Sequence, residues 1–488
     1  MKKDNSTLEE QANYDENEEK DKSHSIWLFW TQRRYILTFM LMMGSVIMFS
    51  LRSNLSVAII QMTSNITDHN GNILKVADFD WNSKEQGIIL SSFFYGSTIT
   101  QIPGGILSKR VNGARLYGIA IGLTSILTIL TPLAAHNFYT MVGIRTLMGL
   151  LLGVTFPVQM ALISKWAPVK ERAQMAMFVN SGLCYGTVIG LQFSGIICDY
   201  INWEFAFYIF GVAGLIWYVF WLVIIKETPE KDTKITEQEK RLILSSIGDQ
   251  GKRDIKIPWM DIFMSVPVWA LIAAHFLHSW PSYMLMMHLP TFFSQIMDIQ
   301  LSKTGFFSCV PFLINGVVGS FSGILSDKLL SKGNLTVIQT RKLFTCVSFV
   351  IQAIFLLGVT FFMTPIASMV MLSVEIAFSA FTLTGFWINF IDIAPQFTGI
   401  IVAISNTIAT LSGIIAPTLT GFIVQNGVVE EWKIVFYISA GVCLLGAIMY
   451  GLMAEGDLQP WAVIPVEDER KSIEMEEKKE MISNKNES

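Results

Sequence analysis

The stretch Gly104-Gly105-Ile106-Leu107-Ser108-Lys109-Arg110 returns in similar form as Ser322-Gly323-Ile324-Leu325-Ser326-Asp327-Lys328. Each copy lies where a long apolar segment leads into a basic loop. The copies are separated by roughly half of the chain, a spacing that indicates a duplicated unit. In membrane proteins, such duplication is typical of folds that expose one central site alternately to the two sides of the bilayer.

The composition agrees with a membrane location. The mean hydropathy is +0.47, 52% of the 488 residues are hydrophobic, and only 15% are charged. A soluble protein of this length needs a more polar surface, so the chain is predicted to contact lipid. The five cysteines lie in apolar segments without CxxC or His-paired spacing, so neither a disulfide framework nor a metal site is expected. They are Cys184, Cys198, Cys309, Cys346 and Cys443.

Windows of about twenty apolar residues predict an all-α membrane protein with twelve spanning helices, six on each side of a polar loop. The acidic tails are predicted to be disordered. The predicted parts are a cytoplasmic tail (1–34), a first half (35–225), a cytoplasmic linker (226–266), a second half (267–454) and a second cytoplasmic tail (455–488). The spans are predicted near 35–62, 87–108, 115–136, 139–163, 173–196, 204–225, 267–291, 303–325, 341–363, 366–391, 398–425 and 432–454.

Basic residues predict the orientation. They are concentrated after the second, fourth and eighth spans and almost absent after the third, fifth and ninth. Because Lys and Arg favour cytoplasmic loops, both termini are predicted to be cytoplasmic. The loop after the first span then lies on the opposite side, where the sequon Asn65-Ile66-Thr67 predicts an N-glycan. Residues 1–25 are polar and acidic, so no cleavable signal peptide is expected.

The linker contains a helix signal. Thr236-Glu237-Gln238-Glu239 precedes Lys240-Arg241-Leu242-Ile243-Leu244, which predicts a capping box at the start of a short amphipathic helix. The helix is expected to lie along the cytoplasmic face.

Two arginines lie inside predicted spans, where a charge is costly and needs a reason. Arg52 is about seventeen residues into the first span, and Arg145 is near the start of the fourth. A positive charge that faces a central cavity would attract an anion. The alternative for both residues is snorkelling of the side chain toward the interface.

Other intramembrane polar residues are candidates for coupling or sensing. Glu375 lies some nine residues into the tenth span, so its carboxyl group should pair, protonate or face water. It could carry a proton or bind sodium, or be a hydrogen-bonded packing residue. His275, His278 and His288 lie in the seventh span. A cavity-lining or proton-sensing role is considered for His278, with a structural histidine as the alternative.

Small residues mark helix faces that can approach closely. They repeat every four residues in corresponding spans of the two halves, which suits two halves that rock against each other. The first set is Gly182, Gly186 and Gly190, and the second is Gly413, Pro417 and Gly421.

Several motifs, in order along the chain, resemble one family. They are Ser91-Ser92-Phe93-Phe94-Tyr95-Gly96, Thr100-Gln101-Ile102-Pro103-Gly104-Gly105, Ser164-Lys165-Trp166-Ala167-Pro168 with Glu171-Arg172, Asp392-Ile393-Ala394-Pro395 and Leu458-Gln459-Pro460-Trp461-Ala462. From about residue 35 to Ala462 the chain resembles the anion:cation symporter family of the major facilitator superfamily, which includes sodium/phosphate cotransporters, sialin and vesicular glutamate transporters. Within this family it is most similar in character to inorganic phosphate cotransporters.

The resemblance implies a twelve-helix facilitator fold with one anion site between the halves. It implies that Arg52, Arg145 and His278 occupy substrate-binding positions. It also implies that Gly105, Gly323, Asp327 and Lys328 belong to the inter-helix loop motif of the inner gate.

The chain departs from the family at several positions. Met148 and Leu152 replace the acidic residues that proton-coupled members carry in helix 4. Leu90 and His278 replace a histidine and an arginine of the vesicular glutamate transporters. These departures argue against sialin-type proton coupling and against glutamate as the substrate.

We therefore expect a secondary active transporter of anions, with sodium-coupled cotransport of inorganic phosphate or a small organic anion as the leading hypothesis. The first alternative is a proton-linked or uncoupled lysosomal exporter of organic anions or acidic sugars. The second is a non-transporting membrane sensor. No enzyme motif was found, namely no phosphate-binding loop, nucleophile elbow or HExxH sequence.

The expected partners are a small anion, a coupling ion (sodium or proton) and the lipid bilayer, with no cofactor and no nucleic acid. A monomer in the plasma membrane or in an endolysosomal or vesicular membrane is expected.

Overall fold

The architecture is described from a computed structural model of the chain. The described residues are 32–67, 73–168, 171–247, 257–297, 301–333 and 335–463. Most of the two tails that were predicted to be disordered, residues 1–31 and 464–488, therefore lie outside the described residues.

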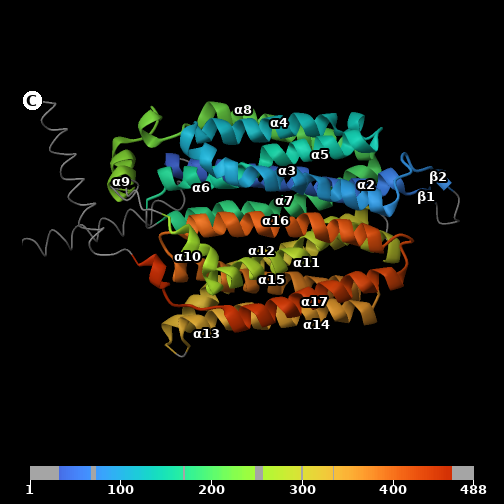
Figure 1. The fold of residues 1–488 in the computed structure, drawn as a ribbon. Helices are drawn as coiled ribbons and strands as arrows, with labels where there is room; N and C mark the ends of the chain where they lie inside the picture. The colour runs from blue at the N-terminus through green and yellow to red at the C-terminus, as the bar shows by residue number, and fades with distance from the viewer. Residues whose placement is uncertain are drawn as a thin grey trace, which may run out of the picture.

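The first half consists of long helices that follow the predicted spans (Figure 1). The fourth predicted span is divided into two helices at Val154. Pro157 lies in the first turn of the second of these helices, where a missing N–H costs little. The helices are α2 (Arg33–Thr63), α3 (Ser83–Arg110), α4 (Gly113–Ala134), α5 (Phe138–Gly153), α6 (Thr155–Trp166), α7 (Arg172–Tyr200) and α8 (Trp203–Ile224).

The second half repeats this plan. Its third span is divided by a single π-helical turn, η3. The segments are α11 (Val266–Met297), α12 (Leu301–Ser331), α13 (Val337–Lys342), η3 (Leu343–Val347), α14 (Ser348–Phe361), α15 (Pro365–Ile393), α16 (Thr398–Ile423) and α17 (Val429–Met453). Shorter segments between and after the halves are η1 (Pro229–Lys231), α9 (Glu237–Ile247), α10 (Trp259–Met264) and η4 (Pro460–Ala462).

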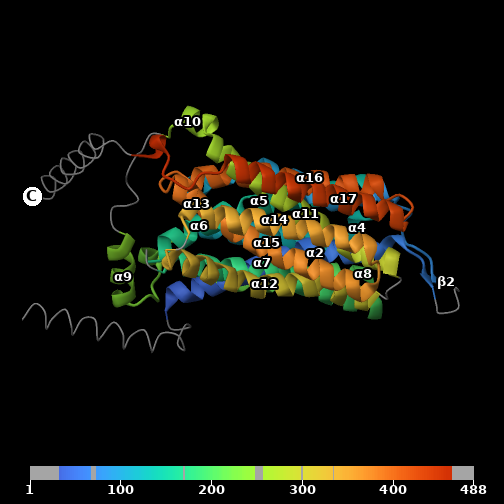
Figure 2. The same ribbon diagram turned by 90° about the horizontal axis from the view of Figure 1, so that it is seen from below.

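The two ends of the helix bundle differ. At one end, the hairpin end, strands β1 (Ile66–Thr67) and β2 (Ile73–Lys75) form an antiparallel pair. At the other end, the termini end, the described chain begins next to α9 and finishes just after η4 (Figures 1 and 2). Asn65 is exposed directly before β1, so the predicted glycosylation sequon lies at the hairpin end.

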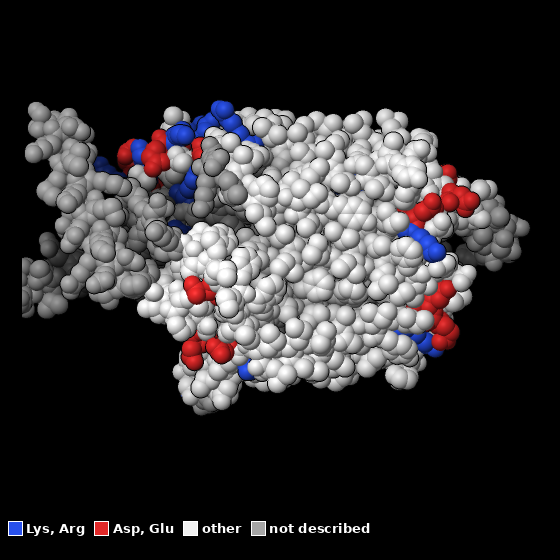
Figure 3. Space-filling model, in the orientation of Figure 1, with Lys and Arg blue, Asp and Glu red and all other residues white. Residues whose placement is uncertain are grey.

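The bundle presents an apolar belt of membrane thickness. Ten helical segments of the described chain are long and apolar enough to cross a membrane. Charged side chains on the visible face lie at its two ends, with a broad uncharged band between them (Figure 3). The helices α3 and α11, of 28 and 32 residues, complete the set of twelve although polar residues interrupt them. The predicted twelve-helix architecture is thereby confirmed.

Each half has its own hydrophobic core, and a smaller set of helices joins the halves. Trp166 and Trp221 are fully buried in the first core, and Trp432 and Phe292 in the second. Between the halves, α3 packs on α16, α7 on α12, and α2 on α11. The helices α3 and α11 are thus less apolar because they face the other half rather than lipid alone.

The predicted glycine face of the fifth span packs within the first half. A Cβ atom on Gly182 or Gly186 would come closer than 3.0 Å to a backbone carbonyl oxygen of α2. The absence of side chains therefore allows α2 and α7 to approach closely, as the spacing predicted.

Candidate functional site

Arg52 is buried in the middle of α2. It lies 19 residues after Arg33 and 11 before Thr63, about 29 Å and about 16 Å from the two helix ends at 1.5 Å per residue. The residue is 9% exposed. The guanidinium is therefore enclosed by protein instead of extending along the helix toward an interface.

Four aromatic rings surround this guanidinium. The Arg52 Cζ atom is 4.2 Å from the ring centroid of Phe94, 4.9 Å from that of Tyr283, 5.2 Å from that of Phe93 and 5.4 Å from that of Phe49. These rings come from α2, α3 and α11, so both halves contribute. Aromatic faces attract a cation but leave its charge in place.

The charge of Arg52 has no anionic partner among the described residues. Its Nε and Nη2 atoms are buried and donate to no acceptor in the described part of the chain, and the polar neighbour of the guanidinium is the Tyr283 side chain. A buried unpaired charge is costly, so such groups normally pair or bind a ligand. The site can thus hold an anion whose charged group meets the guanidinium and whose apolar part packs against the aromatic rings.

Arg145 contacts the backbone of α2 and not the aromatic rings around Arg52. It is fully buried, and its Nη1 and Nη2 atoms donate to the backbone oxygens of Leu51 (3.4 Å) and Arg52 (3.2 Å). The Arg145 side chain thus fixes the turn of α2 that carries Arg52. Its predicted direct contact with an anion stays a prediction.

The three histidines of α11 have separate surroundings. His278 is 9% exposed, its Nδ1 atom has no described partner, and its ring lies 5.6 Å from that of Phe386. The Nδ1 atom of His275 is 2.9 Å from the Ser405 hydroxyl. The Nε2 atom of His288 is 3.1 Å from the Pro417 carbonyl oxygen. The substrate-binding role of His278 stays a prediction.

Glu375 lies in the core of the second half. It is 1% exposed, and its Oε2 atom has no described hydrogen-bonding partner. Its immediate neighbours in the chain, such as Ile376, belong to the apolar core that also contains Cys443 of α17. The carboxyl group of Glu375, for which a coupling role was predicted, therefore lies in an apolar environment.

The repeated motif has a different backbone form from the one expected. Gly323, Asp327 and Lys328 were expected in an inter-helix loop, but they lie within α12, as Gly105 lies within α3. The helix α12 continues through the motif to Ser331. Gly333 follows it with a φ of 68°, the left-handed conformation that glycine favours at a helix end. The motifs therefore extend the two helices at the termini end.

Among the described residues, the ion pairs at the termini end join residues within a half or tie the linker to the first half. Arg341 donates to Asp392 at 2.8 Å and to the Ser326 hydroxyl at 3.1 Å, all in the second half. Arg34 donates to Glu171 at 2.9 Å within the first half.

A polar cluster between the halves was not anticipated from the sequence. Gln101 of α3 donates to Thr410 of α16 at 2.8 Å and accepts from Asn406 at 3.0 Å. The motif containing Gln101 was visible in the sequence, but nothing in it indicated a partner some three hundred residues away.

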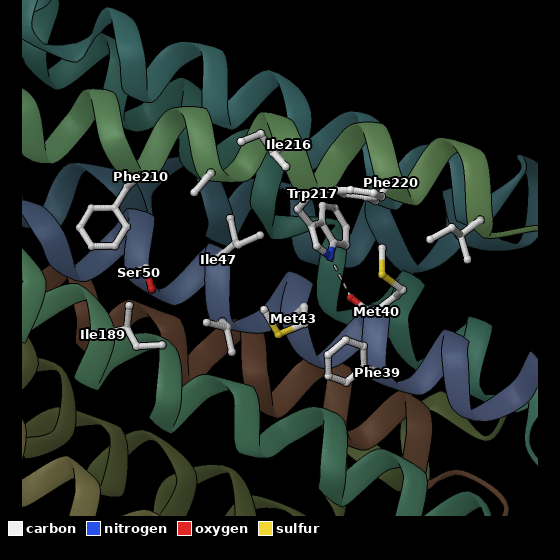
Figure 4. Close-up of a pocket in the computed structure, with 13 residues that line it drawn as sticks. Phe39, Met40, Met43, Ile47, Ser50, Ile189, Phe210, Ile216, Trp217 and Phe220 are labelled. Carbon is white, nitrogen blue, oxygen red and sulfur yellow. Dashed lines mark hydrogen bonds between the residues drawn. The ribbon is translucent and has the colours of Figure 1, made fainter. Parts of the chain in front are cut away.

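An apolar hollow lies on the outer side of the first half and offers no charged group to an anion. It has a volume of about 530 Å3 and lies between α2, α7 and α8 (Figure 4). Its lining is apolar apart from Ser50, and the Trp217 indole donates to the Met40 carbonyl oxygen beside it at 3.2 Å. Among the described residues, no group of three or more His, Cys, Asp or Glu side chains could hold a metal ion.

Comparisons with known proteins identify relatives along most of the chain. Residues 40–417 match the family model of the Major Facilitator Superfamily. The chain is 39% identical to vesicular glutamate transporter 2 of Homo sapiens over 442 residues, which cover 89% of this chain and 76% of that protein. It is 36% identical to sialin of Homo sapiens over 449 residues, which cover 88% and 91% of the two chains.

Solved structures agree on the fold. A bacterial homolog of the human lysosomal transporter Spinster, in an inward-facing and occupied conformation, has a TM-score of 0.68 at 14% identity, with 87% of this chain and 97% of that chain covered. A D-xylose-proton symporter has a TM-score of 0.67 at 14% identity, with 86% and 97% covered.

Proposed function

The chain belongs to the anion:cation symporter family of the Major Facilitator Superfamily and is a membrane transporter, not an enzyme. From this premise we propose that it carries inorganic phosphate or a small organic anion together with sodium. Arg52 is the residue that binds the anion in this proposal. The observation that carries it is the buried guanidinium of Arg52, which has no anionic partner in the described ranges of the chain and contacts residues of both halves.

The surroundings of Arg52 favour the organic anion of the two candidates. Inorganic phosphate is strongly hydrated and is usually held by several N–H and O–H donors. Around Arg52 the described neighbours are mainly aromatic rings, with Phe94 and Tyr283 nearest. An anion with a planar or apolar portion can pack on these rings while its charged group meets the guanidinium.

Transport would follow from the way in which the halves meet. Contacts between α3 and α16 extend from the hairpin end as far as Gln101, whereas the ion pairs that the described residues form at the termini end stay within one half or its linker. In this proposal the anion reaches Arg52 from the termini end. The halves then rock about the site and expose it at the hairpin end.

Sodium is proposed as the coupling ion. The support is the family resemblance together with Met148 and Leu152, which are buried apolar residues at the helix 4 positions where proton-coupled relatives carry acids. We further propose that Glu375 participates in coupling because it is a buried carboxyl group with an unpaired oxygen.

A proton-linked or uncoupled exporter of organic anions is the second candidate. It is favoured by the same Glu375 carboxyl group, because a buried unpaired carboxyl can take up a proton in place of a cation. Loss of transport altogether would instead support a sensor on a transporter fold.

The deciding experiment is uptake by the full chain in proteoliposomes. Labelled phosphate, urate, glutamate and sialic acid are tested separately, with an imposed sodium gradient or an imposed proton gradient. Sodium-driven uptake of phosphate or urate is expected. Uptake driven only by the proton gradient would replace the sodium proposal, and absence of flux for all four anions would contradict it.

Glu375→Gln tests the coupling residue in the same assay. The amide keeps the size of the side chain but cannot ionise. We expect the sodium gradient to lose its effect while exchange of labelled for unlabelled anion continues. Unchanged stimulation by sodium would exclude Glu375 from coupling.

Orientation and location are proposed from the sequence and the relatives. Both termini are proposed to be cytoplasmic and the hairpin end luminal or extracellular, with Asn65 glycosylated. The protein is proposed to be a monomer in the plasma membrane or in an endolysosomal or vesicular membrane.

A further inference from the structure

Phe94 lies where the candidate anion site meets the contact between the halves. Its ring is 1% exposed and is the ring closest to the Arg52 guanidinium, at 4.2 Å. On another side it contacts the Tyr283 ring in an edge-to-face arrangement, with centroids 4.7 Å apart and planes at 62°. Phe94 of the first half thus contacts both Arg52 of the same half and Tyr283 of α11 in the second half.

Gly413 of α16 provides the seat for this ring. A Cβ atom at Gly413 would lie less than 3.0 Å from three carbons of the Phe94 ring. Real Cβ atoms do not approach other atoms so closely, so the ring can rest against the α16 backbone only because residue 413 is glycine. Any other residue at this position would displace the ring or the helix.

The same pair of helices continues as a close contact toward the hairpin end. The Thr418 hydroxyl donates to the Ser91 hydroxyl at 2.9 Å. Gly421 and Gly87 then meet backbone to backbone, because a Cβ on either would lie within about 3.1 Å of the other's Cα. We call this contact, from Phe94–Gly413 to Gly87–Gly421, the α3–α16 seal.

We propose that Phe94 couples the charge state of the Arg52 site to the opening of the α3–α16 seal. This inference rests on the proposed function of Arg52. With the site empty, the cation–π contact draws the Phe94 ring onto the guanidinium and keeps it aligned with its seat on Gly413. An anion that neutralises Arg52 removes most of that attraction, so the seal loses one of its anchors when the site is loaded.

The coupling follows from differential binding. A ligand shifts a conformational equilibrium only if it interacts differently with the two states. In the sealed state the anion competes with Phe94 for the guanidinium, whereas in the unsealed state the ring has already left. The anion therefore binds the unsealed state more tightly, which is the direction that transport requires.

A thiol-labelling experiment tests the coupling without knowledge of the substrate. Ser91 is fully buried in the seal, so Ser91→Cys reports opening of the seal through its rate of reaction with a water-soluble maleimide. The parent chain, with its five native cysteines, gives the background rate. Arg52→Gln, Phe94→Leu and the double variant are compared in this Ser91→Cys chain.

If Phe94 transmits the charge of Arg52, Arg52→Gln should raise the labelling rate about fivefold. The same substitution should have no further effect when Phe94 is already leucine, because the two changes then act through one contact. Equal effects of Arg52→Gln in the two backgrounds, or no effect in either, would overturn the proposal.

A glycine pair provides a test that leaves Arg52 intact. Gly413→Ala should raise labelling of Cys at position 91 by displacing Phe94 from its seat, whereas Gly399→Ala on the same helix, which has nothing within 4 Å of its added methyl group, should not. Gly413→Ala should have little effect in the Phe94→Leu background. Equal labelling of the two alanine variants would contradict the role of the seat.

Uptake measurements separate this inference from the proposed function. If Arg52→Gln abolishes urate and phosphate uptake but the labelling cycle shows no coupling, only the role of Phe94 fails. If the cycle shows coupling while Arg52→Gln leaves uptake intact, Arg52 controls the seal but does not bind the anion, and the proposed function fails.

Discussion

Two buried arginines of the first half have different environments and should have different effects when changed. Arg52 has unpaired nitrogens between aromatic rings, whereas Arg145 donates to two carbonyl oxygens of α2. Lysine preserves the charge at either position but replaces a planar fork by a single ammonium group. The substitution Arg→Lys therefore separates ligand contact from structural support.

We expect Arg52→Lys to raise the apparent KM for the transported anion about tenfold, because a single ammonium group replaces the planar fork that would meet the anion. The melting temperature should change less than for the same substitution at Arg145, since the Nε and Nη2 atoms of Arg52 have no described partner to lose and only the Tyr283 side chain interacts with the guanidinium. Both are measured on the purified protein, by uptake and by a thermal melt. An unchanged KM would contradict direct binding by Arg52.

Arg145→Lys is expected to show the opposite pattern. An ammonium group cannot span the carbonyl groups of Leu51 and Arg52 as the guanidinium does, so about 1–2 kcal/mol of stability should be lost. A thermal melt should show a melting temperature lower by a few degrees. Arg241→Lys, at an exposed position of α9, is the control and should behave as the wild type.

At the scale of elements, the linker helix α9 is fixed to the start of the first span. The Glu239 carboxylate accepts from the backbone N–H groups of Arg33 (3.0 Å) and Arg34 (2.9 Å). It thereby satisfies donors that the first turn of any helix leaves free, and its charge complements the helix dipole. Asp232 before α9 adds an ion pair with Arg33 at 2.8 Å.

This contact explains a partial failure of the capping-box prediction. The predicted helix exists, and the Thr236 hydroxyl accepts from the Glu239 N–H at 3.3 Å. The Glu239 side chain, however, leaves its own helix and caps α2. Two N–H groups of a long helix compete successfully with the single N–H that a capping box offers.

Glu239→Gln should lower the free energy of unfolding by about 1 kcal/mol, because a neutral amide caps α2 without the charge. The matched control is Glu237→Gln on the same helix, whose carboxylate is 73% exposed. In thermal melts, only Glu239→Gln should have a melting temperature below that of the wild type. Equal melting temperatures would show that α9 is not anchored through this carboxylate.

The segment after α8 should respond to acid. Burial alone would raise the pKa of Glu227, but hydrogen bonds and charge from Lys165 and Lys231 lower it below its ordinary value. A carboxyl group with a lowered pKa contributes stability above its unfolded pKa and loses it as the pH falls through the folded pKa. The loss should therefore occur below about pH 4.3, the ordinary value for glutamate.

We expect Glu227→Gln to make the melting temperature less sensitive to acidification in this range. The effect should be below about 1 kcal/mol because the Lys partners are partly exposed. Melts at a series of pH values check this, with Glu230→Gln as the control. A parallel decline in the wild type and Glu227→Gln would contradict the contribution of this ion pair.

At the scale of the whole molecule, the apolar periodicity of the sequence was sufficient for the fold. Each spanning helix needs a predominantly apolar window of about twenty residues, and that requirement is local. The break at Val154, the π turn at Leu343–Val347 and the short β hairpin were missed, because these features depend on packing between helices rather than on a window average.

The site was predictable only in part. An arginine inside an apolar span is conspicuous, so Arg52 was found from its position alone. Its surroundings were not, because Phe49, Phe94 and Tyr283 belong to three different helices. Aromatic residues are also common in membrane spans, so nothing in their spacing distinguishes a ring beside the arginine from one that faces lipid.

The orientation of the bundle can be read from sequons at its two ends. Asn65-Ile66-Thr67 is at the hairpin end, whereas Asn334-Leu335-Thr336 comes in the sequence directly before α13, which begins with Val337 at the termini end. Oligosaccharide is added only on the luminal side of the membrane, so the two sites report opposite orientations. With the termini in the cytoplasm, Asn65 alone of the pair should be modified.

Expression in a glycosylating cell tests this orientation. Treatment with an N-glycosidase should increase gel mobility of the wild type, of Asn334→Gln and of Thr67→Ser, which keeps a sequon. The shift should disappear in Asn65→Gln and in Thr67→Ala. A shift that survives in Asn65→Gln would reverse the orientation, because the sequons that begin at Asn5, Asn334 and Asn486 would then be luminal. The anion would then have to reach Arg52 from the luminal side in the arrangement seen here.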